Sequence, residues 1–183
     1  MYTTLNKIRS HLPCGKGWKT LLKSLGKTEA DDEPLPLLQI LESNGLFDAL
    51  WCLKAVPGFE REKRLLAVAF VEEVVHLITD PRSLSAIDVA RRYANGQATE
   101  QELHNAYDQA VFACSERGSC NTWIDINAER QVRGALRAAL STARTDASVA
   151  AFNSASHSLS TTSTTLDRQA LIFRTMLEPL TTE

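Results

Sequence analysis

The 183-residue sequence predicts an all-α protein, a single domain built as an array of about seven or eight antiparallel helices. Apolar residues recur three and four positions apart through most of the chain, which is the spacing of one helix face. No run of alternating β-branched residues is long enough for a strand. Brief connections separate the first helices, and short connections favour antiparallel neighbours.

Residues 59–96 hold the most apolar run of the chain and should form two helices. The first is expected from Glu60 to Ile78. It is apolar on every side from Leu65 to Val71, as a helix is when neighbours cover it all round, so we expect it to be the core helix. The second should begin at Asp80-Pro81, a side-chain cap followed by proline at the first helical position, and end at Asn95-Gly96.

Three short helices are expected before this central pair, at residues 17–26, 36–43 and 46–56. After it, the run from Thr99 to Glu102 fits a capping box, in which the threonine and the glutamate satisfy each other's backbone amides. A helix should therefore run from this box to about Ser115.

The last third of the chain contains three predicted segments. Residues 123–144 are alanine-rich and should form a helix, whose arginines mark its solvent side. Residues 153–165 are rich in serine and threonine and cannot bury much apolar surface, so we expect a mobile loop. Residues 166–178 regain helical apolar spacing and should form a C-terminal helix that docks on the body of the single domain 1–183.

Composition and charge describe an ordinary globular protein. Hydrophobic residues make up 44% and charged residues 23% of the chain, and its net charge is −2. This balance gives no general attraction to nucleic acid. No apolar stretch approaches the roughly 20 residues that cross a bilayer, and no apolar segment of a secretory signal follows the basic N-terminal residues. We therefore expect a cytoplasmic protein that does not contact a membrane.

Neither a metal nor a cofactor is expected. The cysteines are scattered and should be reduced thiols; they are Cys14, Cys52, Cys114 and Cys120. The pairs His11/Cys14 and Cys114/Cys120 lack the spacing of a zinc site. The run from Gly15 to Thr20 does not have the residue order of a phosphate loop, which also requires a preceding strand. No catalytic residue is assigned.

Several stretches carry a resemblance to a known family: Leu65–Ala69, His76–Ser83, Val89–Gly96 and Ala98–Leu103, with a weaker resemblance at 168–171 and Arg174. They resemble a family of small alanine-rich helical domains described as immunity proteins, known mainly from bacterial genomes. Residues 45–56 also resemble the first helix of that family's pattern. The opening segment, residues 13–46, is similar to proteins encoded by tailed phages and prophages. Phe70 and then Glu72-Glu73 stand where the family usually has a cysteine and a basic pair, so no role of those basic residues is carried over.

The resemblance implies a non-enzymatic protein that binds and blocks another protein, as an immunity protein or a phage-encoded antagonist of a bacterial toxin or host defence protein would. Exposed charges would make the contacts. One candidate surface is the acidic run Glu29, Asp31, Asp32 and Glu33, which could dock on a basic partner, although such a run is commonly a solvated loop. The other is the edge that carries Arg91 and Arg92.

Glu72, Glu73 and His76 form a further polar group on the predicted core helix. Buried charge is costly unless it is paired, so these side chains should face solvent or find partners such as Arg91 and Arg92. We interpret them as a structural polar network that pins two helices. The alternative is that Glu72 and His76 form the acid–base pair of an enzyme.

A second functional hypothesis is nucleic-acid binding by the helix that carries Arg130, Arg133, Arg137 and Arg144. A basic helix face can hold phosphates, but without interleaved aromatic residues it is more often a solvated face. Self-association also stays open, because alanine-rich helices pack readily, although no sustained heptad specifies it.

Overall fold

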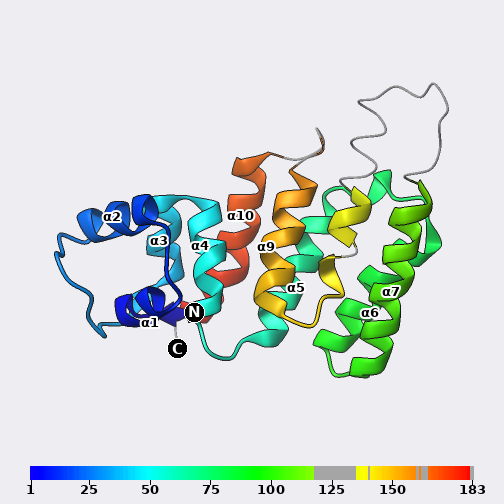
Figure 1. Cartoon of the computed structure of the whole chain (residues 1–183), viewed down its shortest axis with the longest axis horizontal. Helices are drawn as coiled ribbons and strands as arrows, with labels where there is room; N and C mark the ends of the chain where they lie inside the picture. Colours follow the sequence, from blue (N-terminus) through cyan, green and yellow to red (C-terminus); the bar gives the residue numbers. More distant parts are fainter. Residues whose placement is uncertain (118–134, 140, 160, 162–164, 182–183) are drawn as a thin grey trace. The chain divides into compact units, whose positions relative to one another are not determined.

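The computed structural model describes residues 1–117, 135–139, 141–159, 161 and 165–181 (Figure 1). Helices dominate this part of the chain, and its one sheet contains two strands of two residues each. The prediction of an all-α fold is therefore confirmed, whereas the antiparallel arrangement of the helices stays a prediction. None of the described helices combines the length and the apolarity needed to cross a membrane.

The chain forms two compact units. Unit 1 contains Met1–Phe59 and Ala170–Glu183, and unit 2 contains Glu60–Gln169. The prediction of a single domain stays a prediction.

Unit 1 begins with small elements. They are β1 (Tyr2–Thr3), α1 (Leu5–Ser10), α2 (Gly15–Ser24), β2 (Leu35–Pro36), α3 (Leu37–Asn44), α4 (Leu46–Cys52) and the 3-10 helix η1 (Leu53–Ala55). The two strands pair antiparallel, with Tyr2 opposite Pro36 and Thr3 opposite Leu35. The three short helices expected from apolar spacing are confirmed as α2, α3 and α4, although α4 tightens into η1 after Cys52.

A single glycine separates α3 from α4. Gly45 has φ 86°, a conformation that costs little only for a residue without a side chain. The helices on either side bury Leu37, Ile40 and Leu50 completely. The turn at Gly45 therefore allows the apolar faces of α3 and α4 to share one small core.

Unit 2 contains α5 (Glu60–Glu72), the 3-10 helix η2 (Val75–Leu77), α6 (Pro81–Ala94), α7 (Glu100–Arg117), helical residues 135–139 and 141–142, and α9 (Ala147–Ser158). Helix α5 packs against α6 and α9, and α6 packs against α7. Val68 and Val71 of α5 belong to the core cluster of this unit, and Leu66 and Phe70 are also buried. The expected core helix is thus confirmed.

The predicted end of that helix at Ile78 is wrong. Helix α5 ends at Glu72, and the backbone then tightens, because the amide of Val74 donates to the carbonyl of Val71 at 2.9 Å and the amide of Leu77 to that of Val74 at 3.0 Å. Consecutive β-branched residues, Val74 and Val75, are crowded in an α-helix, which favours such a break. The chain is extended at Ile78 before α6 begins.

The predicted mobile loop at 153–165 is wrong for residues 153–158, which complete α9. The carboxylate of Asp146 caps this helix by accepting from the amides of Ser148 and Val149. Small residues allow α9 to approach its neighbours closely, and the buried hydroxyls of Ser154 and Ser158 donate to carbonyl oxygens at 3.3 and 2.7 Å. Composition misled the prediction because serine is buried here with its hydrogen bonds made.

Two further predictions concern the end of the chain. The expected helix 123–144 lies largely outside the described residues, which are helical at 135–139 and 141–142 and leave the helix at Ala143. The expected C-terminal helix is confirmed as α10 (Leu166–Leu177), followed by the 3-10 helix η3 (Glu178–Thr181). Its Phe173 and Leu177 are buried, and Arg174 pairs with Glu42 at 3.2 Å.

Candidate functional site

The hairpin of α6 and α7 is held at one end by a shared arginine. Asp80 caps α6 by accepting from the amide of Arg82 at 2.9 Å, and Pro81 occupies the first helical position. The guanidinium of Arg82 also bonds the Asp80 carboxylate, at 3.1 and 2.8 Å, and reaches Glu116 on α7 at 2.7 Å. This contact joins the first turn of α6 to the last turn of α7.

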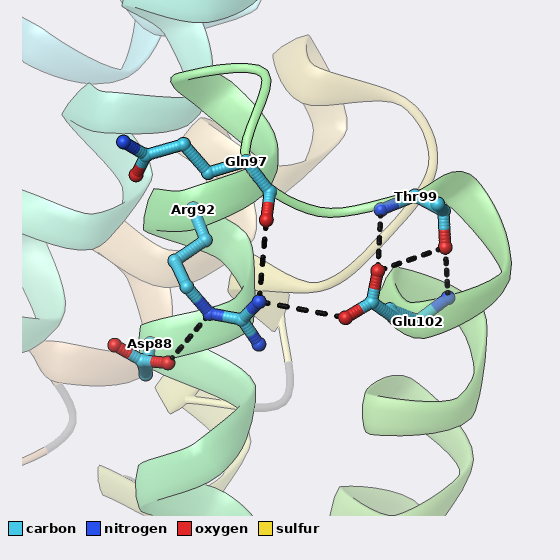
Figure 2. Close-up of polar contacts among 5 residues, drawn as sticks. All are labelled: Asp88, Arg92, Gln97, Thr99 and Glu102. Carbon is cyan, nitrogen blue, oxygen red and sulfur yellow. Dashed lines mark hydrogen bonds and ion pairs between the residues drawn. The ribbon is translucent and has the colours of Figure 1, made fainter.

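A second arginine holds the other end, as Figure 2 shows. Arg92 donates to Asp88 at 3.0 Å, to the carbonyl of Gln97 at 3.3 Å and to Glu102 at 3.4 Å. The other Glu102 oxygen accepts from the amide of Thr99 at 2.7 Å, and the Thr99 hydroxyl accepts from the amide of Glu102 at 3.2 Å. The predicted capping box is therefore confirmed, and it also positions the carboxylate that meets Arg92.

An open groove of about 410 Å³ lies between these two ends. It is lined by Pro81, Arg82, Ser85, Val89, Glu102, Asn105, Ala106 and Gln109, and is called the α6–α7 groove below. Val89 and Ala106 are almost fully buried, whereas Ser85, Asn105 and Gln109 are exposed. The groove is thus lined by two nearly buried apolar residues and by exposed polar residues, with a paired charge at each end.

Arg91 and Arg92, predicted to contact a partner, are both engaged within unit 2. The guanidinium of Arg91 pairs with the carboxylate of Glu72, and that of Arg92 pairs with Asp88 and Glu102. Their side chains nevertheless stay 42% and 37% exposed, so both remain accessible from solvent.

The predicted polar network of Glu72, Glu73 and His76 divides into separate contacts. Glu72 pairs with Arg91, one of the expected partners, while Glu73 accepts from Arg168 of α10 at 2.8 and 3.3 Å. His76 is exposed on η2 and does not share α5 with Glu72. The expectation that Glu72 and His76 stand one turn apart on one helix is wrong.

The predicted acidic surface is a segment of unit 1 that ion pairs and hydrogen bonds hold in place. Lys27 pairs with Asp31 and Glu33 at 2.5 Å each, and Asn6 donates to Asp32 at 2.9 Å. The hydrogen bond from Lys27 lowers the pKa of Asp31 below its ordinary value. Asp32 and Glu33 stay exposed, as does Glu29, so this segment presents negative charge from a fixed backbone.

Sequence reasoning missed Arg64, which is only 2% exposed. Its guanidinium donates to the carbonyl oxygens of Thr142, Arg144 and Thr145 at 2.7, 2.6 and 2.8 Å. Burial lowers the pKa of Arg64 from its ordinary value. A signal was present in the sequence, because position 64 precedes the buried Ala67, Val68 and Val71 by three, four and seven residues and so shares their helix face.

A second, smaller pocket of about 230 Å³ lies beside these carbonyl groups. It is lined by His104, Tyr107, Ala143, Arg144 and Thr145. The turn of residues 143–145 thus meets α7 at a concave surface, and its lining residues include an arginine, a histidine, a tyrosine and a threonine.

Thiols and metal ligands are dispersed in the described part of the chain. Cys14, Cys52 and Cys114 are free there, and Cys120 lies outside it. Burial raises the pKa of the Cys52 thiol to about 12. The described residues contain no group of three histidine, cysteine or acidic side chains that could hold a metal ion.

Gly15 to Thr20 form the first turns of α2, which Cys14 caps by accepting from the amide of Gly17.

Comparison with known proteins finds no family model, no curated protein and no solved structure that matches this chain. Three of the stretches named in the sequence analysis lie close together. Residues 80–83 and 89–96 lie on α6 or at its ends, and residues 98–103 lead into the first turn of α7. These stretches therefore build the two ends and part of the lining of the α6–α7 groove.

Proposed function

We propose that the chain is a non-enzymatic inhibitor that binds and blocks another protein, as an immunity protein or a phage-encoded antagonist of a bacterial toxin or defence protein does. The observation that carries this proposal is the α6–α7 groove, which is held by an arginine at each end. Because Arg82 and Glu102, at its two ends, are held by ion pairs before binding, a partner would lose little additional freedom in ordering them.

The composition of the surface around the groove supports a protein partner. Phe112 is 57% exposed and lies three residues after Gln109 on α7, so it continues the same side of that helix. Exposed aromatic side chains and arginines are enriched where proteins bind one another. Arg92, one of the predicted contact residues, pairs with Glu102, and Glu102 lines the groove.

The acidic segment Glu29–Glu33 would be a second contact in this proposal. It belongs to unit 1, and its exposed carboxylates would attract a basic partner. This attraction should affect the association rate and its salt dependence more than the lifetime of the complex.

Affinity capture from a bacterial lysate tests the proposal, with and without nuclease. We expect stoichiometric recovery of one protein that nuclease does not affect. Ser85→Arg with Gln109→Arg should abolish recovery by filling the groove, since both positions are exposed and tolerate a long side chain. Val111→Arg, an exposed position on the opposite side of α7 from Gln109, is the matched control. Equal recovery by both variants would exclude the groove as the contact surface.

The same experiment addresses the alternative of nucleic-acid binding. Arg137 and Arg144 are exposed, and after burial, which is the main cause, their charges also lower the pKa of His157. Arg130 and Arg133 lie outside the described residues. Recovery of nucleic acid with its bound proteins, lost on nuclease treatment, would support this alternative and contradict our proposal.

A further inference from the structure

We propose that the pocket formed by the turn of residues 143–145 and α7 binds a small oxyanion, the phosphate or carboxylate group of a small molecule. The residues that line this pocket include Arg144 with a guanidinium, Tyr107 and Thr145 with hydroxyl groups, and His104 with an imidazole. These are the donor groups that recognise oxyanions in proteins.

The donors of this pocket are available. Across the described ranges of the chain, no hydrogen bond or ion pair engages the side chains of Arg144, Tyr107 or Thr145. His104 has one weak partner, because its Nε2 lies 3.6 Å from a carboxylate oxygen of Asp108. An anion entering the pocket would therefore gain these interactions without breaking strong ones.

Arg64 makes the turn suitable for an anion. Carbonyl oxygens repel an anion, but those of Thr142, Arg144 and Thr145 accept hydrogen bonds from the buried Arg64 guanidinium. The same bonds fix the backbone from which Arg144 and Thr145 project. Arg64 thus supplies both a positive charge behind the turn and a rigid support, and rigid placement of donors is what makes such a site bind.

The size of the pocket restricts the ligand. A volume of about 230 Å³ leaves room for an oxyanion with a few attached atoms. A phosphorylated or carboxylated small molecule fits these features, and neither macromolecule binding nor the proposed inhibitor function is needed for it.

Isothermal titration at constant ionic strength tests the inference, with inorganic phosphate, pyrophosphate and succinate as separate probes. We expect saturable binding of at least one probe, and its identity distinguishes a phosphate from a carboxylate ligand. Arg144→Gln and Tyr107→Phe should each weaken binding, the former by about tenfold or more, because a charge-assisted hydrogen bond is lost. Both side chains lie away from the fold's own hydrogen bonds, so both variants should stay folded.

Arg137→Gln is the matched control, since Arg137 is an exposed arginine of the preceding helix that does not line the pocket. It should bind the probe as the unaltered protein does. Equal weakening by Arg137→Gln and Arg144→Gln would show only general charge attraction and overturn the inference. So would the absence of saturable binding for all three probes.

Discussion

The guanidinium of Arg64 lies 5.2 Å from the centre of the Tyr93 ring, so a cation of α5 is stacked on an aromatic side chain of α6. In the described residues, the hydrogen-bond acceptors of this cation are carbonyl oxygens rather than a carboxylate. Such an arrangement depends on the planar, forked shape of arginine, because one group must reach three acceptors at once. We therefore predict that lysine cannot replace Arg64 without a loss of stability.

Arg64→Leu should lower the free energy of unfolding by about 3 kcal/mol or more, because it leaves buried carbonyl groups without donors. Arg64→Lys should recover only part of this loss, since an ammonium group cannot reproduce the fork. Urea denaturation measures both. Arg61→Leu on the same helix removes an arginine whose side chain is 55% exposed, and should have a much smaller effect. If Arg64→Lys were as stable as the unaltered protein, the fork would not matter.

The capping box gives a smaller and separate prediction. Thr99→Ala should cost about 1 kcal/mol of stability, because the amide of Glu102 loses its acceptor and Glu102 loses a donor hydroxyl. Thr99→Ser retains the hydroxyl and should be close to neutral. Thermal unfolding of the three proteins provides the comparison, and an equal loss for both variants would contradict a capping role.

His157 should make stability depend on pH. Burial and the charges of Arg137 and Arg144 lower its pKa in the folded state from the ordinary 6.5. Below that ordinary value His157 is protonated in the unfolded chain but stays neutral in the folded chain. Stability therefore falls as the pH drops from about 6.5 toward the folded pKa. The loss is then complete and does not grow further.

His157→Gln should remove this part of the pH dependence. Urea denaturation at about pH 7.5 and about pH 5.5, on either side of the ordinary histidine pKa, measures it in both proteins. The unaltered protein should lose more stability between the two conditions than the variant does. Identical losses would mean that His157 keeps an ordinary pKa in the folded state.

The close packing of α9 predicts intolerance of large side chains. Ala151 is fully buried, so Ala151→Leu should destabilise the protein by about 1 to 3 kcal/mol through overpacking. Asn153→Leu introduces the same side chain at a partly exposed position of the same helix and should be tolerated better. A mobile loop would accept both changes equally, so denaturation of the two variants separates a packed helix from a loop.

The elements that sequence reasoning predicted well have strong local signals. Asp80 and Pro81 start α6, Gly96 follows its end with φ 71°, and the capping box starts α7. Each of these signals acts within a few residues of the chain. Local hydrogen bonding and backbone conformation therefore suffice to place these helices.

The contacts that sequence reasoning missed join residues that are distant in the chain. Glu73 and Arg168 are 95 positions apart, and Arg64 reaches carbonyl groups 78 to 81 positions away. No local pattern specifies such pairs, because they follow from how helices pack. The α9 helix failed for a related reason, since its serines are favourable only when buried carbonyl oxygens lie within reach of their hydroxyls.

The division of the chain has a consequence for its synthesis. Unit 1 is assembled from two segments, Met1–Phe59 and Ala170–Glu183, with the whole of unit 2 between them. A ribosome therefore completes Glu60–Gln169 while the earlier segment still lacks Phe173 and Leu177, both of which are buried in the finished protein. Unit 2 can fold as it emerges, whereas unit 1 must keep apolar surface exposed until translation reaches α10, and that interval is when aggregation competes with folding.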